Sequence, residues 1–164
     1  MDPRDLVEIS EIKSVKYRYM RALDQKLWDG LAECLTEDAS AAYSGGKYAY
    51  EGREAILSFL REAMGAETFL SSHRVTHPEI TLTGPTTAEG TWALNDVVII
   101  TDMDLVIQGA AFYNDEYVKV DGHWKIHSTG YRRTYEETFS RADIASLNLT
   151  ASWWGTDGQS DLDA

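Results

Sequence analysis

The chain has 164 residues, of which 43% are hydrophobic and 26% are charged, a composition that fits one folded domain and excludes a disordered chain. Its 27 Asp and Glu residues outnumber its 15 Lys and Arg residues, and the net charge of −12 repels nucleic acid and anionic membranes. The longest apolar run, residues 97–100, is far shorter than the roughly 20 residues of a membrane span, and the first residues lack the apolar stretch of a signal peptide. We therefore expect a cytoplasmic protein with neither nucleic acid nor a membrane as its partner.

Three helices are predicted within the first 65 residues. Apolar residues recur at every third or fourth position over residues 6–23, which predicts an amphipathic helix with one buried face. A short second helix is predicted over residues 28–35, and a third over residues 53–64, where Gly65 ends it.

Strands dominate the rest of the chain. A small hairpin is predicted around the turn residues Ser44-Gly45-Gly46, and after Gly65 five strands are predicted over residues 71–76, 79–83, 87–100, 105–120 and 124–132. Helices first and strands afterwards predict an α+β fold, a cone-like and antiparallel-rich sheet with the three N-terminal helices packed on its concave face. Residues 1–154 are the single predicted domain, and residues 155–164 are a predicted polar, flexible tail.

Two titratable residues stand at positions that face the predicted core. Asp24 ends the apolar face of the first helix, where a buried carboxylate needs a partner; a solvated helix end or a cap for the second helix is the alternative. His73 shares a strand face with Val75, which predicts that it points inward, although an inward histidine is more often a core residue than a catalyst. Beside Asp24, however, His73 would be a general base, because a carboxylate fixes the tautomer and raises the basicity of the other ring nitrogen.

Other residue types narrow the function less. Nine Tyr and five Trp residues suit a pocket for a flat, mostly apolar ligand, but an aromatic core or a subunit interface would need them too. The lone Cys34 lies in an amphipathic stretch and is interpreted as a buried, inert thiol. The sequence has neither a Cys/His metal pattern nor a glycine-rich phosphate loop, so no metal and no cofactor is expected.

The order of the motifs resembles the SnoaL-like branch of the nuclear transport factor 2 (NTF2-like) superfamily over residues 6–133. The motifs that carry the resemblance are Tyr19 five positions before Asp24, Trp28-Asp29, Gly52-Arg53-Glu54-Ala55-Ile56, Ser71 two positions before His73, and Asp121-Gly122-His123-Trp124-Lys125-Ile126. Within that branch the chain is most similar to scytalone dehydratase, bile acid 7α-dehydratase and hexachlorocyclohexane dehydrochlorinase. The resemblance implies a catalytic Asp24–His73 dyad, 49 positions apart, assisted by Tyr19.

The same resemblance bears on the substrate-binding residues. The aromatic candidates for the pocket are Trp28, Tyr43 and Trp92. Asp96 falls about where the bile acid enzyme has an acidic residue, although a register shift of one position would turn Asn95 inward instead. The dehydrochlorinase has an arginine where this chain has Thr129, and Arg132, or its neighbour Arg133, is the candidate to replace it.

The predicted function is a cofactor-independent, dehydratase-type lyase that acts by β-elimination on a hydrophobic cyclic small molecule. His73, held by Asp24, would remove a proton beside an activated carbon, and water is the expected leaving group. An isomerase with the same dyad, or a non-catalytic protein that only binds a hydrophobic small molecule, stays possible from the sequence.

A homo-oligomer is also expected. Val97 and Ile99 alternate with Val98 and Ile100, so one apolar pair must point away from the pocket. An exposed apolar stripe typically marks an interface, and the resemblance favours a trimer first and a dimer second. Trp153 and Trp154 are expected to cover the pocket mouth or a neighbouring subunit.

Overall fold

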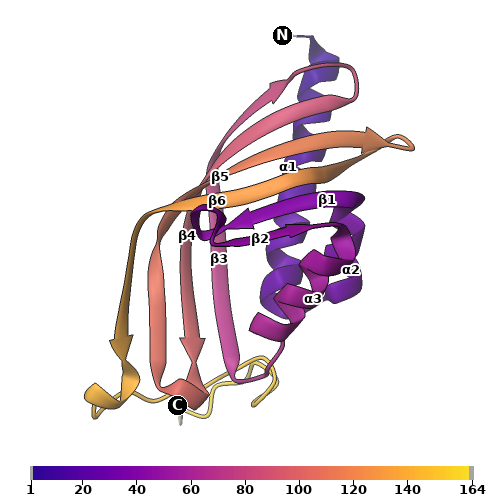
Figure 1. The fold of residues 1–164 in the computed structure, drawn as a ribbon. Coiled ribbons are helices and arrows are strands. Elements are labelled where there is room, and N and C mark those ends of the chain that lie inside the picture. The colour runs from indigo at the N-terminus through magenta and orange to yellow at the C-terminus, as the bar shows by residue number, and fades with distance from the viewer. Residues whose placement is uncertain (1, 163–164) are drawn as a thin grey trace.

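The computed structural model describes residues 2–162, which form three α-helices, three short 3-10 turns and one six-stranded sheet (Figure 1). The helices are α1 (Pro3–Gln25), α2 (Trp28–Cys34) and α3 (Arg53–Met64). The strands are β1 (Leu35–Tyr43), β2 (Tyr48–Glu51), β3 (Phe69–Leu82), β4 (Thr87–Ile100), β5 (Leu105–Val120) and β6 (His123–Ser140). Within residues 2–162, none of the helices combines the length and the apolar character that crossing a membrane requires.

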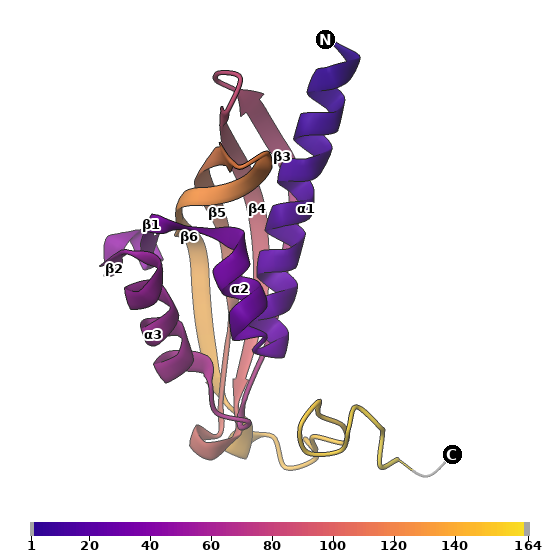
Figure 2. The ribbon, with the colours of Figure 1, turned by 90° about the vertical axis from the view of Figure 1, so that its right-hand side faces the viewer.

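The strands lie in the order β2-β1-β6-β5-β4-β3, and the three helices pack on one face of the curved sheet (Figure 2). Every neighbouring pair is antiparallel except β1 and β6, which run parallel. The α+β prediction with helices on the concave face is confirmed. The parallel pair is a feature that the sequence pattern did not predict.

Three predicted strands differ from the observed ones. The predicted strands 71–76 and 79–83 form the single strand β3, which ends at Leu82 and whose pairing is interrupted between Thr76 and Glu79, where His77 has a left-handed φ of 50°. Strand β6 continues to Ser140, eight residues beyond its predicted end at Arg132. That extension carries Arg133 and Glu136 onto the sheet, and both line the cavity described below.

Helix α1 is fixed at both ends by local hydrogen bonds. At its start, the Asp2 side chain accepts from the Arg4 backbone N–H and the Asp5 side chain accepts from the Asp2 N–H, a reciprocal capping box. At its end, Lys26 adopts the left-handed conformation, and its ammonium group donates to the carbonyl oxygens of Met64 and Phe69 at 2.7 Å each. Lys26 therefore joins the end of α1 to the end of α3 and the start of β3.

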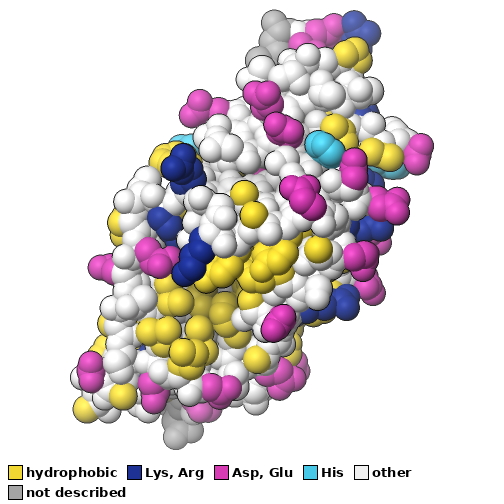
Figure 3. All heavy atoms as spheres, viewed as in Figure 1, with side chains coloured by type: hydrophobic (Ala, Val, Ile, Leu, Met, Phe, Trp, Pro, Cys, Tyr) yellow, Lys and Arg dark blue, Asp and Glu magenta, His cyan; other side chains and the backbone are white. Residues whose placement is uncertain are grey.

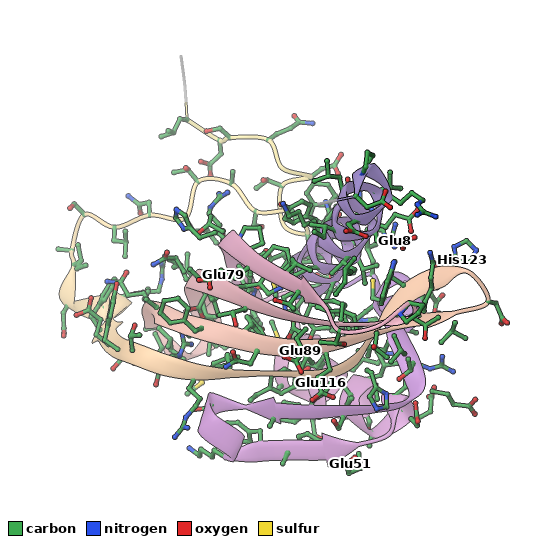
Figure 4. The ribbon with its side chains drawn as sticks, turned by 90° about the horizontal axis from the view of Figure 1, so that it is seen from above. Glu8, Glu51, Glu79, Glu89, Glu116 and His123 are labelled. Carbon is green, nitrogen blue, oxygen red and sulfur yellow. The ribbon has the colours of Figure 1, made fainter. Side chains whose placement is uncertain are left out.

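Two further contacts hold the ends of α1. Near its start, Glu8 accepts hydrogen bonds from Lys119 at 2.7 Å and from Trp124 at 2.6 Å, which places Glu8 beside the β5–β6 turn that carries His123 (Figure 4). Near its end, the Trp154 ring lies 4.2 Å from the Lys26 ammonium group, a cation–π contact.

Trp154 is half-buried and Trp153 is 60% exposed in this chain, and neither lines the cavity described below. Their predicted contact with a neighbouring subunit stays a prediction. The last two residues of the predicted tail lie outside the described residues. The tail from 155 to 162 contains turns and no helix or strand.

The convex face of the sheet carries exposed apolar side chains. Val98 is buried and lines the cavity, whereas its neighbour Val97 is 40% exposed on the opposite face, as strand alternation requires. Phe112 on β5 is 47% exposed on that same outer face.

Candidate active site

A cavity of about 360 Å³ lies between the concave face of the sheet and the helices. Its helix side is apolar and includes Leu23 of α1, with Phe59, Leu60 and Met64 of α3. Figure 3 shows hydrophobic side chains gathered in a hollow below the β1–β2 hairpin. A cavity with one apolar wall and a few polar groups is typical of a small-molecule site.

Asp24 contacts His73, which lines this cavity, whereas Asp24 itself lines a neighbouring surface pocket that His73 also borders. The Asp24 Oδ1 atom lies 2.6 Å from His73 Nδ1, and Asp24 Oδ2 accepts the His73 backbone N–H at 2.9 Å. Ser71 donates its hydroxyl to Asp24 Oδ1 at 2.8 Å, so three donors orient one carboxylate. The sequence-predicted pair is therefore present in the structure, and the inward face assigned to His73 is the observed one.

The geometry of the pair assigns the protons of the imidazole ring. A carboxylate accepts hydrogen bonds, so His73 Nδ1 carries the proton that faces Asp24. In the neutral ring, Nε2 is then unprotonated and available to accept a proton. Asp24 and His73 are 23% and 10% exposed at their side chains, and His73 lines the cavity directly. This arrangement can act as a general base on a bound molecule.

Tyr19 and Tyr43, both sequence-predicted site residues, also line the cavity. Their hydroxyl groups are hydrogen-bonded to each other at 2.7 Å, and both side chains are buried. Burial raises the pKa of Tyr19 and of Tyr43 well above that of a free tyrosine. Both residues are therefore neutral hydroxyl groups near pH 7.

The register of β4 places Asp96, and not Asn95, in the cavity. Asp96 is the cross-strand partner of His73, so the two side chains share one face of the sheet. Arg133 of β6 reaches across β5 and forms a bidentate ion pair with Asp96. Its Nε atom also lies 3.1 Å from a Glu136 carboxylate oxygen. Arg133 is thus held between two carboxylates.

Three sequence-predicted binding residues lie outside the cavity. Arg132 alternates with Arg133 and is exposed on the outer face, opposite Phe112. Trp92 is fully buried in the core and donates to the Tyr117 hydroxyl at 3.0 Å. Trp28 is half-buried on α2, where the Arg61 guanidinium lies 5.9 Å from its ring. The composition predicted that aromatic residues would be needed in a pocket, a core or an interface, but it did not show which of them lie in the core and which line the pocket.

The interior also contains a cluster of hydrogen-bonded polar side chains that the sequence analysis missed. Its members are Lys16, Asp115, Tyr117 and Thr129, and we call this cluster the buried network. Lys16 Nζ and Asp115 Oδ2 are 2.7 Å apart, and both side chains are fully buried. Tyr117 and Thr129 each donate a hydroxyl to Asp115 at 2.7 Å. Thr129, the position of the dehydrochlorinase arginine, is therefore a structural residue here. The missed signal is the spacing of Lys16, which lies on the apolar stripe between Ile12 and Tyr19.

Two further observations concern metal binding and the reactivity of Cys34. Among residues 2–162, no cluster of three or more His, Cys, Asp or Glu side chains is arranged to hold a metal ion. Cys34 is buried as predicted; its thiol lies 3.3 Å from the Gly30 carbonyl oxygen, and burial raises its pKa. A thiol with a raised pKa is a poor nucleophile.

Helices on the concave face of a curved sheet, with a cavity between the layers, define the NTF2-like fold. The SnoaL-like domain family matches residues 4–130, and the chain belongs to this family. The resemblance seen in the sequence is thereby confirmed.

Similar solved structures share this fold at low sequence identity. A protein from Novosphingobium aromaticivorans, provisionally named a scytalone dehydratase, has 24% identity and a TM-score of 0.77, with 93% of this chain and 95% of that chain covered. Hexachlorocyclohexane dehydrochlorinase LinA type 3 from Novosphingobium barchaimii has 19% identity and a TM-score of 0.75, with 88% and 95% covered. A variant of a Mycobacterium tuberculosis protein of unknown function, Rv3472, has 22% identity and a TM-score of 0.70, with 92% and 83% covered.

Proposed function

We propose that this protein is a cofactor-independent lyase that eliminates water from a hydrophobic cyclic small molecule. The observation that carries the proposal is the 2.6 Å contact of Asp24 with His73, whose side chain lines a largely apolar cavity. Two of the similar structures are named as a dehydratase and a dehydrochlorinase, and both of those names denote β-elimination.

The reaction follows from the protonation states assigned above. His73 Nε2 removes a proton from the carbon beside a carbonyl group, and the electron pair of that C–H bond forms a C=C bond. The C–O bond at the next carbon breaks, and the imidazolium of His73 gives its proton to the departing hydroxyl group. The products are an unsaturated ketone and water, and Asp24 stabilises the transient imidazolium. Tyr19 and Tyr43 share one hydrogen bond, so one hydroxyl of the pair keeps its O–H donor for a substrate oxygen in the same cavity.

The charges of the cavity favour water over a halide as the leaving group. The cationic side chains among the described residues that line the cavity are Lys47 and Arg133, and Arg133 is engaged by Asp96 and Glu136. An arginine between two carboxylates has little positive field left for a chloride ion. A hydroxyl leaving group needs a proton instead, and the dyad can supply one.

A direct test uses 3-hydroxy-1-tetralone, a cyclic β-hydroxyketone that loses water to give 1-naphthol, which is followed by its ultraviolet absorbance. We expect turnover by the wild type and at least a 10²-fold loss of turnover in His73→Ala, because general bases contribute about 10²–10⁴-fold. The His73→Ala variant should affect substrate affinity less, since a base acts on the transition state.

His127→Ala is the matched control for this test. His127 also faces a carboxylate, with its Nδ1 atom 3.5 Å from Asp38, but it does not line the cavity. Its variant should keep wild-type turnover. Equal turnover in His73→Ala and the wild type would exclude the dyad mechanism. Binding of the ketone without any chemistry would favour a binding protein, and exchange of its C2 hydrogens with deuterium oxide without loss of water would favour an isomerase.

We also propose a homo-oligomer, with three subunits as the first choice and two as the second. The support is the exposed apolar outer face of the sheet at Val97 and Phe112. Sedimentation equilibrium at micromolar concentration should give a mass that is a multiple of 18.4 kDa, and a single 18.4 kDa species would refute the oligomer.

A further inference from the structure

Two tyrosines on strand β5, Tyr113 and Tyr117, have the same burial but different surroundings. Both are 1% exposed, and both point to the concave face of the sheet, four residues apart. The Tyr117 hydroxyl is saturated, because it donates to Asp115 at 2.7 Å and accepts from Trp92 at 3.0 Å. The Tyr113 hydroxyl forms no hydrogen bond to any of the described residues 2–162.

The Tyr113 hydroxyl is free because it opens onto the cavity. Tyr113 lines the cavity, whereas Tyr117 does not, and the Tyr113 hydroxyl is not one of the fully enclosed polar atoms that lack a partner. A hydroxyl removed from bulk water without a partner costs free energy, and a bound polar atom would recover it. The neighbouring Tyr19 and Tyr43 hydroxyls already bond to each other.

The Tyr113 ring is held from two sides. The Lys16 ammonium group of the buried network lies 3.5 Å from the ring centroid, a close cation–π contact. The Tyr131 ring meets it edge-on, with centroids 5.4 Å apart and an interplanar angle of 70°. A side chain fixed in this way presents its hydroxyl in one position before a ligand arrives, which reduces the entropic cost of binding.

The protonation state of Tyr113 determines which ligand atom it can bind. Burial raises the pKa of Tyr113 well above that of a free tyrosine, so the phenol keeps its proton throughout the physiological range. Its O–H group therefore offers a donor, and a carbonyl oxygen is the matching acceptor.

We propose that the Tyr113 hydroxyl donates a hydrogen bond to a carbonyl oxygen of the substrate, so that the cavity selects cyclic ketones over rings of the same shape that lack oxygen. The inference rests on the cavity being the substrate site of the proposed function. It adds to that function a substrate class and a specificity-determining residue.

The test compares two non-reactive probes, 1-tetralone and tetralin, which have the same fused rings with and without a carbonyl oxygen. Calorimetric titration of the wild type should show tighter binding of 1-tetralone. In Tyr113→Phe the affinity for 1-tetralone should fall about 3- to 10-fold, the range for one neutral hydrogen bond, while the affinity for tetralin stays unchanged. The midpoint of thermal unfolding should not fall, because the removed hydroxyl has no protein partner among the described residues.

Tyr117→Phe is the matched control, because it removes an equally buried hydroxyl from the same strand face. It should lower the thermal midpoint, since Asp115 and Trp92 each lose a partner, and it should leave both probe affinities within twofold of the wild type. An equal loss of both probe affinities in Tyr113→Phe would overturn the inference, because the ring and not the hydroxyl would then be responsible. Failure of 1-tetralone to bind the wild type better than tetralin would overturn it as well. A selective loss of ketone affinity in a protein that does not dehydrate 3-hydroxy-1-tetralone would support this inference and refute the proposed reaction.

Discussion

The concave face of the sheet carries two groups of ionisable side chains that differ in what surrounds them. In the buried network, the Asp115 carboxylate meets Lys16, Tyr117 and Thr129, and its side chain is fully buried. At the dyad, Asp24 is equally well oriented, but its partner His73 faces a cavity with one ring nitrogen to spare. The difference teaches that burial of charge alone does not identify a reactive site. A reactive site also needs a polar group that the protein holds by a hydrogen bond and that still has a free donor or acceptor facing a cavity.

The largest expected effect comes from breaking the buried network. Lys16→Met leaves the Asp115 carboxylate in the interior without its counter-charge, which should lower the free energy of unfolding by about 3–5 kcal/mol. Urea unfolding measures this loss. The double variant Lys16→Met/Asp115→Leu removes both charges and should recover part of the loss, because Tyr117 and Thr129 then lack the acceptor that Asp115 provides. A loss below about 1 kcal/mol in the single variant would show that water reaches Asp115, contrary to the fully buried geometry.

Breaking the dyad should have the opposite profile, with activity lost and stability kept. Asp24→Asn removes the charge that stabilises the His73 imidazolium, and turnover of 3-hydroxy-1-tetralone should fall by at least 10²-fold. The free energy of unfolding should change by less than about 1 kcal/mol, because Asp24 is partly exposed. Asp38→Asn, at the surface His127 pair, is the control and should change neither quantity. A large loss of stability in Asp24→Asn would make the dyad a structural pair like the buried network.

A third prediction concerns the ion pair that crosses the floor of the cavity. Gly109 lies beneath Arg133, and a Cβ atom there would collide with the Tyr135 carbonyl oxygen and lie 3.3 Å from Arg133 Nη1. Gly109→Ala should therefore destabilise the protein by about 1–3 kcal/mol and displace Arg133 from Asp96. Gly30→Ala on α2 is the matched control, because its nearest neighbours are 3.9 Å away and alanine favours a helix by up to about 1 kcal/mol. Equal free energies of unfolding in the two variants would show that Gly109 is not needed for the ion pair between Arg133 and Asp96.

The smallest expected effect concerns Glu8, an ionic contact nearer the surface than either group. Hydrogen bonds from Lys119 and Trp124 lower the pKa of Glu8 below its ordinary value. A depressed carboxyl pKa contributes stability that is fully present above the unfolded pKa, about 4.3, and is lost as the pH falls through the folded value. The stability difference between the wild type and Glu8→Gln should therefore shrink as the pH falls below about 4.3, as thermal unfolding at several pH values would show. A difference that is constant from pH 7 to pH 3 would contradict the assigned shift.

The sequence predicted elements whose signal is local. Helix α3 has its predicted bounds because Gly65 follows the last apolar turn, whereas the pairing of Asp24 with His73 was implied by the family resemblance. The sequence did not predict that Arg133, and not Arg132, faces the cavity. Strand β6 has a register irregularity between Ile126 and Ser128, opposite Tyr117 and Glu116. A bulge changes which residues share a face, so that Arg133 and not Arg132 points inward.

Lys16 and Tyr113 show a second limit of sequence reasoning. A lysine on a helix normally extends its charge to water, and only the contact with Asp115, almost a hundred residues away, makes its burial acceptable. Tyr113 alternates with other inward residues of β5, but whether its hydroxyl meets protein or empty space depends on the packing of three separate elements.

The parallel pairing of β1 with β6 has a consequence for the order in which the chain folds. Ala41 and Thr129 are partners in this pair, about 90 residues apart, and no short turn can bring them together. Contacts of such long sequence separation slow folding, because loop-closure entropy is lost before the contacts form. During synthesis, β1 and β2 emerge long before β6. The edge of β1 that pairs with β6 therefore stays unpaired until β6 has been made. Closure of the cavity is therefore a late event in folding, and refolding should show the β3–β4–β5 meander protected from hydrogen exchange before β1.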